Sequence, residues 1–180
     1  TLDLVNNNKY VSNSNERLES FALTARKNLS KGAIVMGVNL EKEDGLMDLT
    51  SKLTSGEFPS DTSSSILISE GLANYYNMAV GDSLIFLGQG YHGASANGIY
   101  PVHGILKFSM PILNERLVLM PILAAQDLYA APNRLTSLVL QIDKPSHLNK
   151  LQKQVASELD LVQYELLNWK VLLPELVQTI

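Results

Sequence analysis

The sequence predicts an α+β domain, in which strands alternate with short helices and hairpins. The chain has 180 residues, enough for one domain with its own core or for two small lobes that share one. Residues 136–142, TSLVLQI, have the β-branched and apolar composition of a strand. Residues 145–159 place Leu148, Leu151 and Val155 at helical spacing on one face. Both kinds of element therefore occur in one compact unit.

Charge and cysteine content exclude several classes of function. The chain has 14 basic and 18 acidic residues, a net charge of −4, without a long block of either sign, so no nucleic acid partner is expected. The absence of cysteine excludes disulfides, thiolate zinc sites and cysteine nucleophiles. No run of 18 apolar residues occurs, and the start has neither an initiator Met nor a signal pattern. We expect a processed protein or a piece of a larger one.

The N-terminal third predicts a surface segment, a hairpin and a helix. Residues 1–15 are polar and rich in asparagine, so we expect a surface segment with one short helix. Apolar residues recur over 18–25 and a β-branched run covers 33–38, which predicts two strands joined by a turn at residues 30–32. Residues 41–55 carry leucines three and four positions apart and precede a glycine, which predicts a helix.

The middle of the chain predicts a loop, three strands and a helix. Residues 59–65 are rich in Ser, Asp and Thr and predict a loop. Residues 64–69, SSILIS, predict a short buried strand, and residues 70–77 predict a helix. Strands are expected again over residues 83–87 and 98–108, where β-forming residues prevail.

Beyond residue 110 the expected order is strand, helix, strand and helix. Residues 116–120 predict a strand and residues 123–130 a short helix. Residues 136–142 are expected to form an internal strand, packed against the helix of residues 145–159, which Ser146 is placed to cap.

The C-terminal residues predict a last strand over 161–165 and an apolar-faced helix from residue 168. An ordinary core helix would show the same apolar stripe. The stripe consists of Trp169, Leu172, Leu173, Leu176, Val177 and Ile180.

The stretch GQGYHG at residues 88–93 contains the glycines of a dinucleotide-binding loop but not its context. Such a loop is followed by a helix, and by an acidic residue about twenty positions later. Here Gly98 and Pro101 break any helix, and no acidic residue that ends a strand stands at that distance. We therefore expect no nucleotide and no other cofactor. The stretch predicts instead a mobile hairpin loop of eleven residues, longer than the usual two to five, which suits contact with a partner.

No catalytic or metal-binding group of residues is expected. The histidines lack partners at ligand spacing, and no Ser/His/Asp set or nucleophile elbow is present. Isolated aspartates fit turns and caps better than paired carboxylates. The residues considered are His92, His103, His147, Asp61, Asp82 and Asp127.

An ordered set of motifs resembles a known family. Its members are Ile68-Ser69-Glu70-Gly71-Leu72-Ala73, Val80-Gly81-Asp82, Val102-His103-Gly104-Ile105, Val118-Leu119-Met120-Pro121 and Ala125-Gln126. In this order they are similar to the extracytoplasmic core domain of FtsX-like ABC transporter permeases, the MacB-like group that includes the lipoprotein-releasing permeases. The resemblance covers residues 35–180.

The resemblance implies a non-catalytic domain on the periplasmic side of the inner membrane, held between two membrane spans. It would couple ATP-driven motion of the membrane helices to substrate or lipoprotein release. The implied partners are a separate cytoplasmic ABC ATPase, a second permease copy in a homo- or heterodimer, and a periplasmic partner or lipoprotein cargo. The implied fold is a mixed α/β lobe, residues 1–60 with 121–180, and an inserted, more β-rich lobe, residues 61–120. The C-terminal stripe would lead into the second span.

The resemblance also assigns a role to the loop of residues 89–97. Lipoprotein-releasing permeases carry a partner-docking hairpin in this interval, which implies docking roles for Gln89, Tyr91, His92 and Asn97. Tyr91 would act as an aromatic anchor.

Two alternatives from other classes remain open. One is a stand-alone periplasmic ligand- or glycan-binding module, with Tyr75, Tyr76, Tyr91 and Tyr100 as stacking residues. The other is a hydrolase, which would need a buried Ser, His or Asp cluster.

Overall fold

The computed structural model describes residues 8–160 and 162–168. The chain divides into two compact units, Ser14–Val139 as the larger one, and Thr1–Asn13 with Leu140–Ile180 as the smaller one. Strands and helices are mixed, which confirms the predicted α+β class. The two compact units have other bounds than the predicted lobes, residues 1–60 with 121–180 and residues 61–120. The lobes therefore stay a prediction.

The N-terminal hairpin is confirmed, but it begins earlier and turns earlier than predicted. Strand β1 (Val11–Arg26) pairs antiparallel with β2 (Leu29–Val38) through ten residue pairs. The turn lies at Lys27, whose φ is 53°, and not at residues 30–32, which belong to β2. The short helix expected within residues 1–15 is absent from residues 11–15, because these residues belong to strand β1.

Six strands of the structure pair in a closed circuit, β1-β2-β7-β4-β6-β5 and back to β1. The β2–β7 and β4–β6 pairs are parallel, whereas the β7–β4, β6–β5 and β5–β1 pairs are antiparallel. The remaining circuit strands are β4 (Ile66–Ser69), β5 (Ser83–Gln89), β6 (Ser95–Leu106) and β7 (Leu117–Pro121). The strands expected at 64–69, 83–87, 98–108 and 116–120 are thus confirmed.

Two further strands lie outside the circuit. Strand β3 (Leu53–Gly56) pairs with the end of β6, and β8 (Ser137–Ile142) follows β1 at the end of the sheet order. The prediction that residues 136–142 form an internal strand is therefore wrong, and Leu138, Val139 and Leu140 are only half-buried.

Alternate residues of the central strands pack into two separate clusters of buried side chains. In β7, Val118 and Met120 belong to an inner cluster, whereas Leu117 and Leu119 belong to an outer cluster. Strand β4 divides in the same way. Because both faces of these strands are buried, their sequences are continuously apolar.

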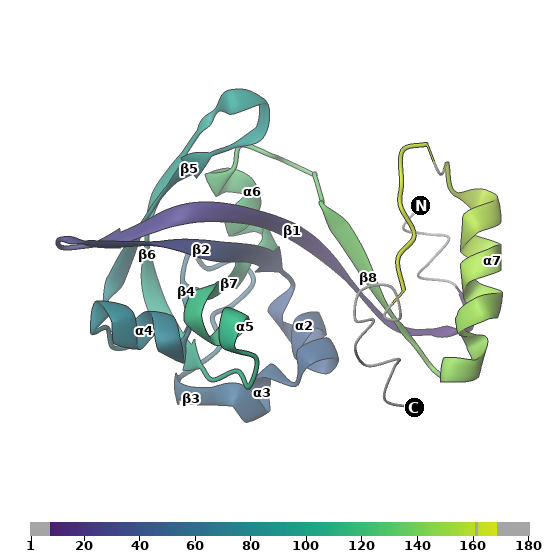
Figure 1. The fold of residues 1–180 in the computed structure, drawn as a ribbon, viewed down its shortest axis with the longest axis horizontal. Helices are drawn as coiled ribbons and strands as arrows, with labels where there is room; N and C mark the ends of the chain where they lie inside the picture. Colours follow the sequence, from purple (N-terminus) through teal and green to yellow (C-terminus); the bar gives the residue numbers. More distant parts are fainter. Residues whose placement is uncertain (1–7, 161, 169–180) are drawn as a thin grey trace. The chain divides into compact units, whose positions relative to one another are not determined.

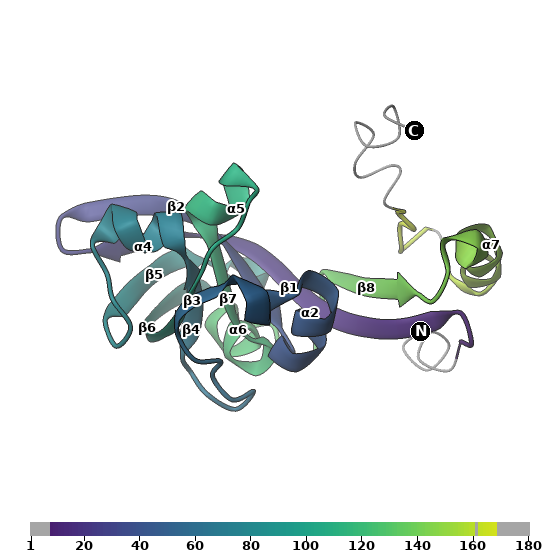
Figure 2. The ribbon, with the colours of Figure 1, turned by 90° about the horizontal axis from the view of Figure 1, so that it is seen from below.

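Short helices lie around the sheet of the larger unit (Figures 1 and 2) and contribute to both clusters. Helices α4 (Glu70–Tyr76) and α6 (Ile122–Leu128) contribute Leu72, Tyr76 and Leu128 to the inner cluster. Three helices cover the outer cluster: α2 (Leu40–Met47), α3 (Leu49–Lys52) and α5 (Pro111–Arg116). They contribute Leu40, Leu49 and Leu113, respectively. The predicted helices at 70–77 and 123–130 are confirmed.

The predicted helix over residues 41–55 is interrupted. Asp48 adopts the left-handed conformation with φ 52°, which separates α2 from α3, and the last residues form β3. The Asp44 carboxylate accepts hydrogen bonds from the Thr50 amide and hydroxyl, at 2.6 and 2.7 Å, across this break. Pairing of Leu53 with Leu106 in the sheet overrides the helical spacing of the leucines.

A buried ion pair joins α2 to β1. Glu43 of α2 has a fully buried side chain, and its carboxylate accepts from the Arg17 guanidinium. The Asn15 amide donates to the same carboxylate at 2.7 Å and to the Asn39 carbonyl at 3.0 Å. The buried charge thus has both a cation and a neutral donor, as such a group requires.

The Val80-Gly81-Asp82 motif forms the turn that enters β5. The Asp82 carboxylate accepts from the Ala79 amide at 2.9 Å and pairs with the Arg26 guanidinium of β1 at 2.8 Å. These two interactions lower the pKa of Asp82, the amide hydrogen bond most. The motif therefore ties the start of β5 to the end of β1.

The smaller unit contains helix α7 (Leu148–Glu158), which buries Leu151 and Val155 as predicted. Ser146 does not cap it, because the residue before the helix is His147, and Ser146 lies in the preceding 3-10 turn (Pro145–His147). The His147 Nδ1 atom lies 2.9 Å from the Asp143 carboxylate, whose pKa is lowered by this hydrogen bond.

A strand is predicted over residues 161–165, but residues 162–165, which the structure describes, form none. The chain turns there instead, since Gln163 and Tyr164 donate backbone hydrogen bonds to the Asp160 carbonyl, each at 3.0 Å. The helix predicted from residue 168, with its apolar stripe, lies beyond the described residues. In the part of the chain that the structure describes, no helix is long and apolar enough to span a membrane.

Replacing Leu151 by Ala removes the side chain that α7 buries, leaving a cavity. We expect the free energy of unfolding to fall by roughly 2 to 5 kcal/mol, measured by urea denaturation. Lys153→Ala, at an exposed position of the same helix, is the control and is expected to stay within about 0.5 kcal/mol of the wild type. Equal stabilities of the two variants would show that the α7 face is not buried.

Replacing Asp82 by Asn removes the charge that pairs with Arg26. Because the pKa of Asp82 is lowered in the folded state, its charge stabilises the fold above the usual aspartate pKa, and this stabilisation is lost as the pH falls. We expect a lower melting temperature than wild type at pH 7 and a difference that shrinks as the pH falls below the usual aspartate pKa. Asp127→Asn, at an exposed aspartate of α6, controls for the loss of one charge. A difference that is constant with pH would refute this role.

Candidate functional site

The four residues predicted to dock a partner surround the tip of the β5–β6 hairpin. Gln89 is the last residue of β5, Asn97 lies in β6, and Tyr91 and His92 lie between the strands. The connection comprises residues 90–94, because Gly88 and Gln89 pair with Ala96 and Ser95. The expected eleven-residue loop is thus wrong, and the length argument for contact does not hold.

The tip, residues 90–94, is a compact turn. The Gly90 amide donates to the Ala94 carbonyl at 2.7 Å, and the Ala94 amide donates to the Tyr91 carbonyl at 3.1 Å. Between them His92 adopts the left-handed conformation, with φ 52°, which is unusual for a residue with a side chain. A strand follows the glycines, as the sequence predicts, so the stretch lacks the helix of a dinucleotide-binding loop.

The segment after α6 holds the tip in place. The Tyr91 amide donates to the Tyr129 carbonyl at 2.7 Å. At Gly90 a Cβ atom would lie 2.4 Å from the same carbonyl oxygen, so only glycine allows this approach. The Arg134 guanidinium lies 4.1 Å from the centre of the Tyr91 ring. The tip is therefore folded onto residues 129–134 and is not a free loop.

The tip presents an aromatic and cationic cluster, formed by Tyr91, His92 and Arg134. The Tyr91 ring is 39% exposed, and its centre lies 4.0 Å from that of the His92 ring. Among the described residues no carboxylate pairs with Arg134. A guanidinium stacked on an aromatic ring can bind a carboxylate and an apolar group together. Arg134 was not among the predicted site residues, since only the fold brings it to Tyr91.

Below the tip, β1, β5 and β6 share an outward face that is apolar and uncovered. Leu84 and Phe86 of β5 point into the inner cluster, so Ile85 and Leu87 point outward. Leu87 pairs with Leu23 of β1, and Ile85 pairs with Ile99 of β6, so these side chains are direct neighbours. The five exposed apolar residues, with their exposed fractions, are Phe21 75%, Leu23 46%, Ile85 37%, Leu87 43% and Ile99 67%.

Gln89 and Asn97 lie on this same outward face, since strand residues two apart share a face. The apolar composition of residues 83–87 predicts a strand but does not distinguish its two faces. The alternate spacing of Phe21 and Leu23 in β1 would by itself predict a buried face, yet both residues are exposed.

The four tyrosines considered as stacking residues do not form one site. Tyr76 and Tyr100 are 3% and 8% exposed and belong to the inner cluster. Burial raises the pKa of both phenols, and it raises the pKa of Tyr129, behind the tip, to about 12. These hydroxyls are therefore protonated at neutral pH. Tyr75 is half-exposed and donates to the Ser30 carbonyl at 3.0 Å, apart from the tip.

Polar groups are dispersed in the described part of the chain. No group of three or more His, Asp or Glu side chains could hold a metal ion there. His103 is exposed on β6, and His147 is engaged by Asp143. Asp61 accepts from the Asn39 amide at 2.7 Å, in the local role expected of an isolated aspartate.

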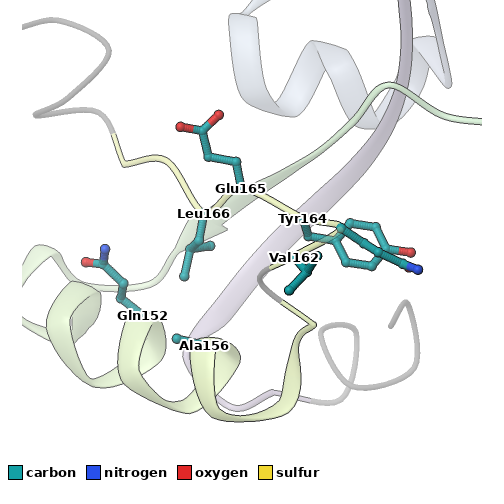
Figure 3. Close-up of a pocket in the computed structure, with 7 residues that line it drawn as sticks. Gln152, Ala156, Val162, Tyr164, Glu165 and Leu166 are labelled. Carbon is teal, nitrogen blue, oxygen red and sulfur yellow. The ribbon is translucent and has the colours of Figure 1, made fainter.

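A shallow recess in the smaller unit has a volume of about 500 Å³ (Figure 3). Gln152 and Ala156 of α7 form one wall, and residues 162–166 form the other. Glu165 is the charged residue of this lining, and its carboxylate points away from the recess in Figure 3. The recess thus has no charged side chain directed into it.

Replacing Gly90 by Ala tests whether the tip depends on close contact with residue 129. The added Cβ would collide with the Tyr129 carbonyl, so we expect the Tyr91 amide to lose its hydrogen bond. Hydrogen exchange of this amide is expected to accelerate about fivefold to tenfold. Gly32→Ala, where a Cβ meets no atom within 4 Å, is the matched control and is expected to leave the exchange unchanged. Unchanged exchange in Gly90→Ala would contradict the observed attachment.

Neither a protein-family model nor a curated protein sequence matches the chain. Solved structures similar to it include the two described here. The extracellular domain of the noncanonic ABC-type transporter YknZ from Gram-positive bacteria has a TM-score of 0.66 at 13% identity, over 89% of this chain and 82% of that chain. The periplasmic region of MacB from Actinobacillus actinomycetemcomitans has a TM-score of 0.62 at 16% identity, over 87% and 73%. The chain therefore has the fold of the extracytoplasmic domains of these ABC-type transporters.

Proposed function

We propose that this chain is the non-catalytic extracytoplasmic domain of an ABC transporter permease. The observation that carries the proposal is the fold, shared over 89% of the chain with such a domain. ATP hydrolysis would then take place in a separate cytoplasmic subunit. A second permease copy would complete the transporter.

The finer proposal is that the domain acts in lipoprotein release and that the tip docks a periplasmic partner. The exposed Tyr91 ring, which lies next to the Arg134 guanidinium and edge-to-face with the His92 ring, supplies the anchor. Gln89 and Asn97 flank it as polar contacts at the end of the outward face. Because the tip is already folded onto residues 129–134, it would lose little conformational entropy on binding.

The side of the membrane on which this domain lies can be tested by cysteine labelling, since the chain itself has no cysteine. In the full-length protein, with any other cysteines replaced, Ser95→Cys at the exposed start of β6 is expected to react with a membrane-impermeant maleimide in intact cells. Ser69→Cys, at a position 1% exposed, is the matched control and is expected to react only after denaturation. Reaction of Ser95→Cys only after lysis would place the domain in the cytoplasm and refute the proposal.

Replacing Tyr91 by Ala tests the docking role. A central aromatic anchor contributes about 2 kcal/mol or more, so we expect lipoprotein release by the full-length transporter to slow at least about tenfold. The readout is the fraction of lipoprotein retained in the inner membrane. Tyr75→Ala removes another half-exposed tyrosine, away from the tip, and is expected to release lipoproteins at the wild-type rate. If the Tyr91→Ala transporter releases lipoproteins at the wild-type rate, the tip has only a structural role.

A further inference from the structure

Beside the tip of the β5–β6 hairpin lies an exposed cation, Arg134, whose ligand the proposed function leaves open. Its guanidinium is 4.1 Å from the centre of the Tyr91 ring. This ring contact uses no N–H donor, and within the described residues the guanidinium forms no hydrogen bond or ion pair. We propose that Arg134 binds a carboxylate of the docked protein, an Asp or Glu side chain with an apolar neighbour. This inference rests on the docking role proposed for the tip.

The charge of the surrounding chain favours an acidic ligand. Residues 83–106, which form the hairpin, contain no Asp, Glu, Lys or Arg, and Arg134 is the single residue of these types in 128–142. Asp127, the acidic residue that precedes this segment, forms no ion pair with Arg134. No carboxylate of the described chain therefore neutralises the guanidinium. A carboxylate of a partner would complement it.

The backbone of the tip favours a carboxylate over a phosphate group. Phosphates are commonly held by several backbone amides in addition to cations. Four of the five tip residues, Gly90, Tyr91, Gly93 and Ala94, already donate their amides to backbone carbonyls. A carboxylate has one charge and two oxygens, which match the parallel N–H groups of a single guanidinium. A phosphate, free or in a lipid headgroup, would lack its further donors here.

Apolar surface beside the guanidinium suits an apolar neighbour of the carboxylate. The Tyr91 ring is 39% exposed, and Leu135, the residue that follows Arg134, is 37% exposed. An apolar side chain placed against them would exclude water from the ion pair. Because an ion pair is stronger where water is excluded, the apolar contact and the charge contact would support each other.

The fold holds Arg134 in place before a ligand arrives. The Arg134 amide donates to the Ala131 carbonyl at 3.2 Å, and the Gln126 side-chain amide donates to the Arg134 carbonyl at 3.0 Å. Ala130 and Asn133 adopt the left-handed conformation, with φ 49° and 57°, which is uncommon for residues with a side chain. Such conformations cluster at ligand sites, where the surrounding structure enforces them. A cation positioned in advance needs little ordering on binding.

NMR titration of the 180-residue chain with three acetylated tripeptide amides tests the ligand chemistry without the transporter. Their central residue is glutamate, glutamine or phosphoserine, between two leucines, and the Tyr91 ring signals report binding. We expect the glutamate peptide to bind with a Kd on the order of 10 mM, and the other two peptides at least about fivefold more weakly. Arg134→Gln is expected to remove the preference for glutamate over glutamine. Lys27→Gln, at an exposed lysine of the β1–β2 turn, is the matched control and is expected to keep it.

Three results of the titration would overturn the proposal. The first is equal affinity for the glutamate and glutamine peptides, or no shift by either up to roughly 50 mM. The second is tighter binding of the phosphoserine peptide, which would assign the site to phosphate. The third is a preference for glutamate that survives in Arg134→Gln or is lost equally in Lys27→Gln.

A charge series at residue 134 of the full-length transporter gives a second test. We expect lipoprotein release to slow in the order Arg134→Lys, Arg134→Gln and Arg134→Glu, with the last at least about tenfold below wild type, because it repels a carboxylate. Lys27→Glu makes the same charge change elsewhere and is expected to release at the wild-type rate. Equal rates for Arg134→Gln and Arg134→Glu would show that Arg134 acts only by packing on Tyr91, and would overturn the ion pair.

The two proposals can fail separately. If Tyr91→Ala slows release and Arg134→Glu does not, the docking role stands and the carboxylate contact is refuted. If the chain prefers the glutamate peptide but Ser95→Cys is labelled only after lysis, the ligand chemistry stands and the extracytoplasmic location is refuted.

Discussion

Backbone pairing along both edges of β1 is the constraint on which the larger unit depends. Arg17 to Arg26 pair with β2, and Leu23, Thr24 and Ala25 pair also with β5, so the strand circuit closes at this point. The Thr24 hydroxyl lies 3.0 Å from the Tyr76 hydroxyl, which donates to the Thr24 carbonyl at 2.7 Å. Helix α4 is thereby joined to the closing strand. A disturbance of β1 would open the circuit and expose the inner cluster to water.

Closure of the circuit divides the strands into two kinds. Strands β4 and β7 are covered on both faces and have continuously apolar sequences. Strands β5 and β6 are covered on one face, yet Ile85, Leu87 and Ile99 are apolar on the other. Burial within the described chain does not account for these three residues.

The tip of the β5–β6 hairpin combines rigidity with exposure. Its backbone is tied to the Tyr129 carbonyl, while the Tyr91 ring and the Arg134 guanidinium face solvent in part. A contact site supported in this way needs little ordering when a partner arrives. Docking by a loop that becomes ordered only on binding, which a long loop would have implied, does not fit the five-residue connection.

The sequence by itself determined the fold class, most strands, the helices at 70–76 and 122–128, and the resemblance to an extracytoplasmic permease domain. These depend on local composition, such as the apolar run at 66–68, and on the order of motifs along the chain. Of the candidate site, it located Gln89, Tyr91, His92 and Asn97 in one hairpin.

Only the tertiary structure decided the features that depend on pairing between distant residues. Pairing of Leu53 with Leu106 ended the predicted helix, and pairing of Gln89 with Ser95 shortened the predicted loop. Arg134 reaches Tyr91 because the segment after α6 returns to the hairpin. Local propensities contribute less than about 1 kcal/mol per residue, so long-range pairing and burial override them wherever the two disagree.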